Sequence, residues 1–224
     1  MENNLRFEKK FLIPPYYQNK IFDMILSNPY RFNESYKKRF INNIYLDDFN
    51  HNSAMDNING NTIRSKFRLR WYGEKYGIKK SVIEKKYKRG NVGNKNFFEI
   101  NDFNFSRNSN KFSIKSQIEN KSINYFLKDA IKCFNPELFN SYSRRYFTSY
   151  DKKIRITIDY GIENYKINSI SHFRMPDYEN KNKMIMEIKY DNNLLLDISS
   201  VCQYFPFRQE RFSKFIYGYL IVNA

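Results

Sequence analysis

The stretch RSKFRLRWY at residues 64–72 carries the side chains best suited to chemistry in this chain. In an extended strand alternate side chains point to opposite faces, so Arg64, Lys66, Arg68 and Arg70 share one face. Cations two residues apart on one face sit roughly 6–7 Å from each other, and they repel unless they are well solvated or face a polyanion. The stretch therefore predicts either a half-buried strand with a solvated basic face or a surface that binds a polyanion.

The same alternation of ionisable and apolar residues recurs along the chain. In three further stretches a glutamate stands two residues before a lysine: Glu8 and Lys10, Glu84 and Lys86, and Glu187 and Lys189. Another stretch carries Arg144 and Arg145 side by side. In a further stretch Arg155, Thr157 and Asp159 alternate with Ile154, Ile156 and Ile158. The recurrence indicates that several strands present one charged face in common.

Two architectures are compatible with such strands. An open sheet with one solvated face shows this alternation, but it has no reason to favour arginine or the repeated Glu-x-Lys spacing. A closed antiparallel barrel with a charged lumen and peripheral helices explains both features. Cations in a lumen need counter-charges, which phosphates supply, and carboxylates among them would hold a divalent metal.

The elements that must position these residues follow from periodicity and turn signals. We expect strands over 5–13, 41–46, 63–72, 78–88, 140–149, 153–160 and 183–190, and helices over 15–26, 122–134 and 207–222. The segments 47–60 and 89–112 read as a polar loop and as an Asn-rich excursion with one short strand. The pattern predicts one α+β domain over residues 1–224.

The net charge and the hydropathy of the sequence limit the partners and the cellular location that we expect. The 224 residues carry a formal net charge of +16, which favours a polyanionic partner. The sequence contains neither a run long enough for a membrane helix nor the apolar core of a signal peptide. We therefore expect a soluble, cytoplasmic protein.

The motifs, taken in order, resemble those of the VTC domain. This is the polyphosphate-polymerase branch of the triphosphate tunnel metalloenzymes, the superfamily that includes the CYTH proteins. The matching segments are RFEKKF (6–11), NIYLDD (43–48), SKFRLRWYG (65–73), VIEKKYK (82–88), YSRRYF (142–147), IRITID (154–159), IMEIKY (185–190) and RFSKF (211–215). The likeness covers most of the chain.

The resemblance implies a fold, a cofactor and a set of site residues. The fold is an antiparallel barrel that forms a basic triphosphate tunnel, and the cofactor is Mn²⁺ or Mg²⁺. The implied phosphate ligands are Lys10, Arg68, Arg70, Lys86, Arg144, Arg155, Lys189 and Lys214, of which Arg68, Arg70, Arg144, Arg155 and Lys214 are also implied to be catalytic. Glu187 is the implied metal ligand, with Glu8 and Glu84 as secondary carboxylates.

Alternatives stay open for some of these residues. Glu8 and Glu84 could instead pair with neighbouring lysines, and Lys214 could be solvated, because it projects opposite the apolar stripe of the expected helix. Arg145 lies on the face opposite Arg144 and is left out. Arg64 and Lys66 share the basic face but match no position of the family pattern.

The implied reaction is transfer of the ATP γ-phosphoryl group to a growing inorganic polyphosphate, with release of ADP. ATP and polyphosphate are then the expected partners, no specific nucleic acid is expected, and a membrane partner protein stays open. The rival functions are triphosphate hydrolysis on the same fold, non-catalytic polyphosphate binding, and general nucleic-acid binding. Hydrolases of the superfamily tend to open with Glu-x-Glu-x-Lys, whereas this chain has Arg6 at the first position, which favours the polymerase.

Overall fold

The strands of this computed structural model join one eight-stranded sheet. Residues 6–89, 92–121, 131–168, 182–191 and 194–223 are described. The strand order is β1-β8-β7-β6-β2-β3-β4-β5. The strands are β1 (Arg6–Ile13), β2 (Asn33–Asp48), β3 (Ile63–Tyr72), β4 (Gly77–Arg89), β5 (Val92–Phe105), β6 (Phe134–Thr148), β7 (Arg155–Lys166) and β8 (Met184–Asp191).

Short helices lie between and after the strands. They are the 3₁₀-helix η1 (Pro15–Tyr17) and the α-helices α1 (Ile21–Leu26), α2 (Asn52–Ile58), α3 (Lys111–Lys121), α5 (Leu195–Gln203) and α6 (Lys214–Asn223). The combination of a largely antiparallel sheet with helices confirms the predicted α+β class. No helix among the described residues is long and apolar enough to span a membrane.

The chain divides into two compact units. Unit 1 consists of the described residues within 1–39, 142–162 and 179–212, and unit 2 of those within 40–141, 163–178 and 213–224. Strands β2, β6 and β7 contribute residues to both units. Each unit has its own apolar core, so we describe each one separately.

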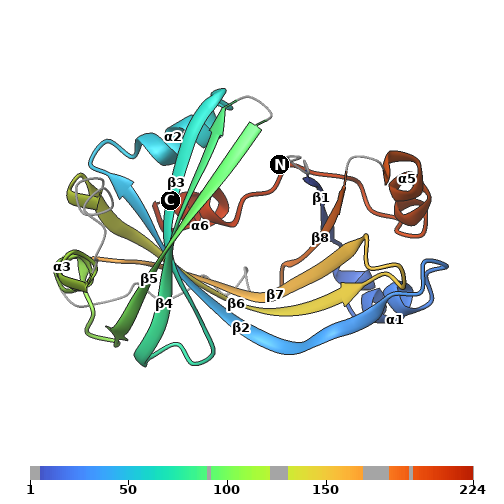
Figure 1. Ribbon diagram of the computed structural model, residues 1–224, viewed down its shortest axis with the longest axis horizontal. Helices are drawn as coiled ribbons and strands as arrows, with labels where there is room; N and C mark the ends of the chain where they lie inside the picture. Colours follow the sequence, from blue (N-terminus) through green and yellow to red (C-terminus); the bar gives the residue numbers. More distant parts are fainter. Residues whose placement is uncertain (1–5, 90–91, 122–130, 169–181, 192–193, 224) are drawn as a thin grey trace. The chain divides into compact units, whose positions relative to one another are not determined.

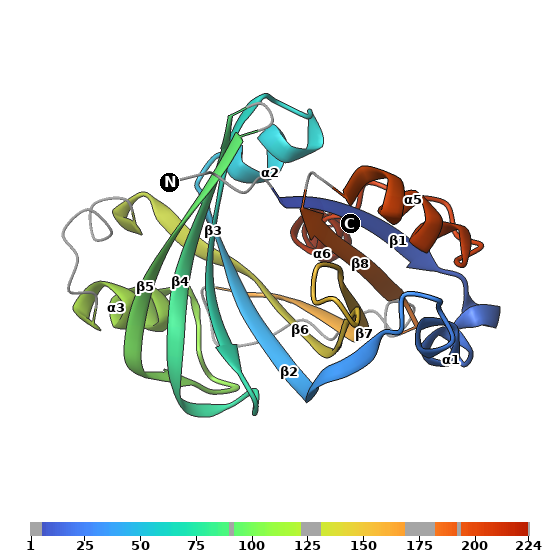
Figure 2. The same cartoon turned by 45° about the vertical axis from the view of Figure 1, so that its right-hand side comes forward.

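Unit 1 is built around β1, β8 and β7. β1 pairs antiparallel with β8, and β8 pairs antiparallel with β7. One face of these strands is largely apolar and carries Phe11, Ile13, Ile156, Ile158, Met184, Met186 and Ile188. Helices α1 and α5 pack onto it through Ile21, Ile25, Ile198 and Val201. In both ribbon views α5 lies alongside β1 and β8 (Figures 1 and 2). The ionisable residues that alternate with this apolar set consequently share the other face.

Unit 2 is built around the consecutive antiparallel strands β3, β4 and β5 (Figure 1). Trp71 is fully buried and packs against Phe103, Phe105 and Phe139. The turn between β3 and β4 is flanked by Gly73 and Gly77, which both have positive φ, as the predicted hairpin through GEKYG requires.

Helix α6 is held tightly within unit 2. A Cβ on Gly218 would lie 2.5 Å from Asn164 Oδ1 and 2.7 Å from a Leu138 methyl group. Phe215 and Tyr219 are buried in the cluster that also contains Tyr45. The helix backbone therefore packs directly on its neighbours, which fixes the position of its first residue, Lys214.

Most predicted strands are confirmed, but several boundaries were wrong. The stretch 41–46 is part of the much longer β2, whose first eight residues are exposed on both faces and so carry no alternation signal. The segment 89–112 contains the 14-residue β5 rather than a short strand. The helix expected over 15–26 consists of η1 and α1 with a turn between them.

The helix predictions were less accurate. The polar segment 47–60 contains α2, and α3 and α5 were not predicted. The helix expected over 122–134 lies mostly outside the described residues, and Phe134 begins β6. The C-terminal helix begins at Lys214 rather than Phe207.

The closed barrel stays a prediction. The described strands form a linear order with β1 and β5 at its two ends. The assignment of residues 1–224 to a single domain likewise stays a prediction.

Candidate functional site

Unit 1 gathers ionisable side chains on the polar face of its strands. We call them the Glu187 cluster: Glu8, Lys10, Arg144, Arg155, Thr157, Asp159, Glu187 and Lys189. Strand register brings them together, because Lys10 and Thr157 both lie opposite Glu187, while Glu8 and Arg155 both lie opposite Lys189. Six of the predicted site residues on these strands, Glu8, Lys10, Arg144, Arg155, Glu187 and Lys189, are therefore neighbours.

Arg144 forms the most buried ion pair of the cluster. Its Nε and one terminal nitrogen donate to the two oxygens of Asp159 at 2.5 and 2.7 Å, and Asp159 is fully buried. The same guanidinium lies 3.5 Å from Glu187 Oε2. Burial opposes the charged form of Arg144, but the carboxylates outweigh it, so the pKa of Arg144 is raised well above its usual range. The arginine is thus permanently charged and rigidly oriented.

Lys10 links three oxygen groups within unit 1. Its Nζ donates to the Phe212 carbonyl at 3.0 Å and lies 3.1 Å from Glu8 Oε1 and 3.8 Å from Glu187 Oε1. Burial and the charge of Glu187 raise the pKa of Glu8, but Lys10 and Lys189 outweigh them and the pKa is lowered overall. Glu8 therefore pairs with a lysine, as the alternative holds, and it is ionised at neutral pH.

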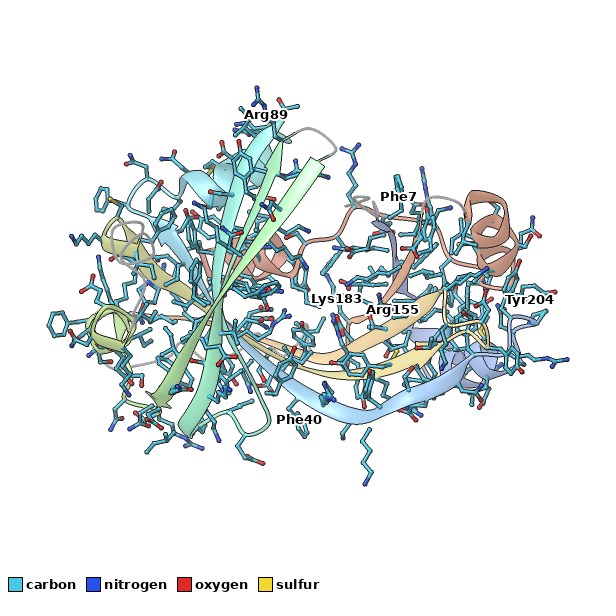
Figure 3. All side chains as sticks on the ribbon, viewed as in Figure 1. Phe7, Phe40, Arg89, Arg155, Lys183 and Tyr204 are labelled. Atoms are coloured by element: carbon cyan, nitrogen blue, oxygen red, sulfur yellow. The ribbon has the colours of Figure 1, made fainter. Side chains whose placement is uncertain are left out.

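Arg155 and Lys189 form the more accessible part of the cluster. Lys189 Nζ lies 3.8 Å from Glu187 Oε2, and Arg155 is exposed at the start of β7, where its label stands in Figure 3. No ion pair to Arg155 is seen among the described residues. Its guanidinium is available to an anion without first breaking a protein contact of that kind.

Thr157 provides a buried hydroxyl beside Glu187. It is 7% exposed, and its Oγ1 finds no hydrogen-bond partner among the described residues. A buried polar group without a partner costs roughly 1–3 kcal/mol, so the Thr157 hydroxyl is a group that a water molecule or a ligand oxygen would satisfy.

Unit 2 gathers a second set of charged and polar side chains, on β2, β3, β4, β5 and α6. We call it the Arg68 cluster: Asn43, Lys66, Arg68, Arg70, Glu84, Lys86, Lys95 and Lys214. The register again explains it, because Arg68 lies between Tyr45 and Glu84, and Lys66 lies opposite Lys86. The remaining predicted phosphate ligands, Arg68, Arg70, Lys86 and Lys214, all belong to this cluster.

Glu84 holds the two arginines of β3. Arg68 donates to Glu84 Oε2 from Nε at 2.9 Å and also from a terminal nitrogen, and Arg70 lies 3.2 Å from Glu84 Oε1. Arg70 Nε donates to Asn43 Oδ1 at 2.8 Å. Burial raises the pKa of Glu84, but Arg68 and Arg70 outweigh it and the pKa is lowered. The ion pairs of Glu84 join it to the two arginines and occupy both of its oxygens, and the charge of Lys95 also lowers its pKa.

A row of lysines crosses three strands next to this ion pair. Lys66 on β3 lies opposite Lys86 on β4, which in turn lies opposite Lys95 on β5. Like charges directly opposite each other on neighbouring strands are destabilising. The row therefore concentrates positive charge on one face of β3, β4 and β5, which suits a polyanion.

Lys66 and Lys214 meet at the beginning of α6. Lys66 Nζ lies 3.2 Å from Ser213 Oγ, 4.8 Å from the ring centre of Phe215 and 5.0 Å from that of Tyr45. Its ammonium therefore contacts the residues on both sides of Lys214. Lys214 itself is only 8% exposed, so the alternative that it is simply solvated is wrong. Close packing of the helix at Gly218 turns this residue inward.

The residues of the Glu187 cluster fit a divalent metal better than those of the Arg68 cluster. Glu8 and Glu187 both contact the Lys10 ammonium, and the unpartnered Thr157 hydroxyl lies opposite Glu187. Mg²⁺ commonly takes one or two carboxylates and completes its shell with water and substrate phosphates. Among the described residues no three or more carboxylate, imidazole or thiol groups gather as metal ligands, so a metal here needs oxygens from a substrate.

Five residues of the two clusters were not singled out as site residues from the sequence: Asn43, Lys66, Lys95, Thr157 and Asp159. Asp159 stood on the polar face of its strand, but its pairing with Arg144 depends on strand neighbours. Lys66 carried the alternation signal without a family counterpart. Asn43, which accepts from Arg70, gave no signal of its own beyond its place in NIYLDD.

The fold is shared with several solved structures. PH1819 protein from Pyrococcus horikoshii OT3 has a TM-score of 0.53 at 14% identity, covering 98% of this chain and 99% of that one. A proposed adenylate cyclase from Vibrio parahaemolyticus has a TM-score of 0.53 at 12% sequence identity, and the match covers 95% of this chain and 96% of that one. The third structure is HpAC1 from Hippeastrum, a proposed adenylyl cyclase described as having a dominant triphosphatase activity. Its TM-score is 0.53 at 15% sequence identity, and the match covers 96% of this chain and 94% of that one. These likenesses show that the chain shares the fold of these structures.

The family follows from the sequence as a whole. The model of the VTC domain matches residues 5–223, so the chain belongs to the VTC domain family. No curated protein matches the chain. The resemblance drawn from the ordered motifs is thereby confirmed.

Proposed function

We propose that this protein is a metal-dependent polyphosphate polymerase that transfers the ATP γ-phosphoryl group to the end of an inorganic polyphosphate chain. The observation that supports the proposal most directly is the presence, in a VTC domain, of two preorganised sets of cations on the polar faces of its strands. One set includes the carboxylates Glu8 and Glu187, and the other includes a row of three lysines.

The proposed mechanism relies on position and charge. Phosphoryl transfer passes through a loose, in-line transition state that needs little covalent help from the protein. Arg144, fixed by Asp159, and the accessible Arg155 would contact non-bridging oxygens and neutralise the charge that develops there. Within unit 2, Arg68 and Arg70, fixed by Glu84, and Lys214 are the proposed catalytic cations and would contact phosphate oxygens there. No side-chain nucleophile is required.

Phosphate binding is proposed for the lysines as well. Lys10 and Lys189 would bind phosphate in the Glu187 cluster, and Lys86 in the Arg68 cluster. A Mn²⁺ or Mg²⁺ ion would be held by Glu187 and Glu8, and it would supply charge neutralisation for the substrate phosphates. For Glu84, whose two oxygens already bind arginines, we propose orientation of those arginines as the main role.

Triphosphate hydrolysis is the second candidate function. HpAC1, which shares this fold, is described as having a dominant triphosphatase activity, and hydrolysis needs the same cations with water as the acceptor. Arg6 at the first position of the opening motif still favours the polymerase. A non-catalytic polyphosphate binder is the third outcome, and an experiment on the products separates all three.

The test is to incubate the purified protein with ATP and Mn²⁺ or Mg²⁺, and to measure ADP, free phosphate and polymer on a polyphosphate-stained gel. ADP accompanied by polymer, both lost in Arg68→Ala and Glu187→Gln, is the expected result. ADP with equimolar free phosphate and no polymer would indicate a triphosphatase. Polyphosphate binding without any turnover would indicate a binder, and absence of both binding and turnover would overturn the proposal.

A further inference from the structure

An aromatic pair with an arginine lies next to the Glu187 cluster. The rings of Tyr36 on β2 and Tyr146 on β6 contact edge to face, with centres 5.6 Å apart. The guanidinium carbon of Arg39 lies 4.9 Å from the Tyr36 ring centre and 5.6 Å from that of Tyr146. All three residues belong to unit 1. We call them the Tyr36 platform.

The Tyr36 platform is continuous with the proposed phosphate site. Tyr146 stands two residues after Arg144 on the same strand, so both side chains point to the same face. The Arg144 guanidinium carbon lies 6.0 Å from the Tyr146 ring centre. One face of β6 thus carries first an oriented guanidinium that suits phosphate oxygens and then an aromatic ring, while Tyr36 and Arg39 extend the ring surface.

The opposite face of the same strand shows what a purely structural arrangement looks like. Arg145 lies 4.1 Å from the Phe22 ring centre, pairs with Glu34, and stands next to Phe147, which is 1% exposed in the unit 1 core. Tyr36 is instead 56% exposed. Its ring is not committed to a core, so a flat partner can reach it.

We propose that the Tyr36 platform binds the nucleobase of the donor nucleotide while the neighbouring Arg144 contacts its phosphates. Exposed tyrosine rings and arginine planes are the surfaces on which nucleobases stack, and stacking on them tolerates different bases because every base has a π-face. This inference rests on the proposed function, because it assigns the nucleoside part of the same substrate. The inference predicts that loss of the platform affects the binding of ATP but not that of inorganic tripolyphosphate, which has the phosphates without the base.

The test compares the two ligands directly by titration calorimetry with Mg²⁺, using ATP and inorganic tripolyphosphate on wild type, Tyr36→Ala, Tyr36→Phe and Tyr150→Ala. Tyr150 is a matched control because it is a 76% exposed tyrosine of the same unit that lies outside the platform. We expect Tyr36→Ala to weaken the binding of ATP roughly five- to tenfold and the binding of tripolyphosphate less than twofold. Tyr36→Phe and Tyr150→Ala should bind both ligands as the wild type does.

The outcomes distinguish failure of the inference from failure of the proposed function. If Tyr36→Ala weakens both ligands equally, or weakens neither, the platform does not bind the base, although the phosphate site stands. If the wild type binds neither ligand, the proposed function fails and the inference fails with it. A melting curve for Tyr36→Ala that matches the wild type shows that a selective loss of ATP binding is not caused by unfolding.

Discussion

The two charged clusters differ in how they are neutralised. In the Glu187 cluster the cations alternate with carboxylates, since Arg144 contacts Asp159 and Glu187, and Lys10 contacts Glu8 and Glu187. In the Arg68 cluster Glu84 holds two arginines, and the lysine row Lys66–Lys86–Lys95 lies beside it. The first cluster is close to balanced, whereas the second carries an excess of positive charge.

The difference indicates that the two clusters have different roles in the proposed function. A balanced cluster keeps rigid, oriented groups without a ligand, which suits metal binding and the reacting phosphates. A cluster with excess positive charge repels itself until a polyanion arrives, which suits the binding of a polyphosphate chain. We therefore expect substitution of Asp159 or Glu187 to lower stability or turnover, and substitution of Lys86 to lower the affinity for polyphosphate.

The largest effect is expected for Asp159→Asn. This change removes the charge that neutralises buried Arg144, and breaking a buried ion pair from one side costs about 3–5 kcal/mol of the free energy of unfolding. Denaturant unfolding measures it. Glu34→Gln is the matched control, since Glu34 also makes a bidentate pair, with Arg145, but at the surface, and should cost about 1 kcal/mol or less. Equal losses in the two variants would contradict the view that the Glu187 cluster depends on internal neutralisation.

Glu187→Gln should abolish turnover while sparing binding. Removing the proposed metal ligand should lower the rate of ADP formation by about a hundredfold or more, the scale of losing one strong electrostatic contact to the transition state. Polyphosphate affinity, measured by fluorescence anisotropy with a labelled chain, should change less than about threefold, because most of the excess charge lies elsewhere. Retained turnover would remove Glu187 from the proposed site, and Glu34→Gln again serves as the control.

Lys86→Gln should weaken binding and leave the fold intact or slightly more stable. It removes the middle charge of the lysine row, so the free energy of unfolding should stay constant or rise by about 0.5 kcal/mol. Polyphosphate affinity should fall by roughly threefold to tenfold at low salt, with a shallower salt dependence. Lys80→Gln on the same strand is the control, because Lys80 is exposed and paired with Glu99. A loss of stability in Lys86→Gln would show that the row is not repulsive.

The smallest effect concerns the acid side of the stability profile. The folded-state pKa of Glu84 lies below its ordinary value of 4.5 because Arg68 and Arg70 outweigh the effect of burial. Its contribution is therefore complete above the unfolded pKa and is lost as the pH falls through the folded pKa. Glu84→Gln should be less stable than wild type near neutral pH by on the order of 1 kcal/mol, with the difference shrinking below about pH 4. A gap that is independent of pH would contradict this assignment.

The sequence predicted what depends on local pattern. The hairpin of β3 and β4 was predicted because alternation, two glycines and a short turn all lie in one stretch, and the polar face of β3 carries Arg68 and Arg70 as expected. The helices α2 and α3 were missed because they are short and polar, with few apolar positions to reveal a helical period.

The partners within each cluster could not be predicted because they depend on register between strands. A shift of one residue would move each charge to the other face, and nothing in the single sequence fixes that Arg144 meets Asp159 or that Glu84 meets both arginines. Lys214 illustrates a further limit. Its burial follows from where α6 begins and from the close approach at Gly218, which no stripe of apolar residues indicates.

The pairing of β1 with β8 has a consequence for synthesis on the ribosome. Residues 6–13 pair with residues 184–191, so the first strand leaves the ribosome long before its partner, by roughly 10–40 s at ordinary translation rates. An unpaired strand of this kind invites association with other chains, and charged side chains counteract it. Glu8, Lys9 and Lys10 stand inside β1. Lys10, proposed to bind phosphate, and Glu8, proposed to hold a metal, would thus act together with Lys9 to keep the nascent strand from aggregating before β8 is synthesised.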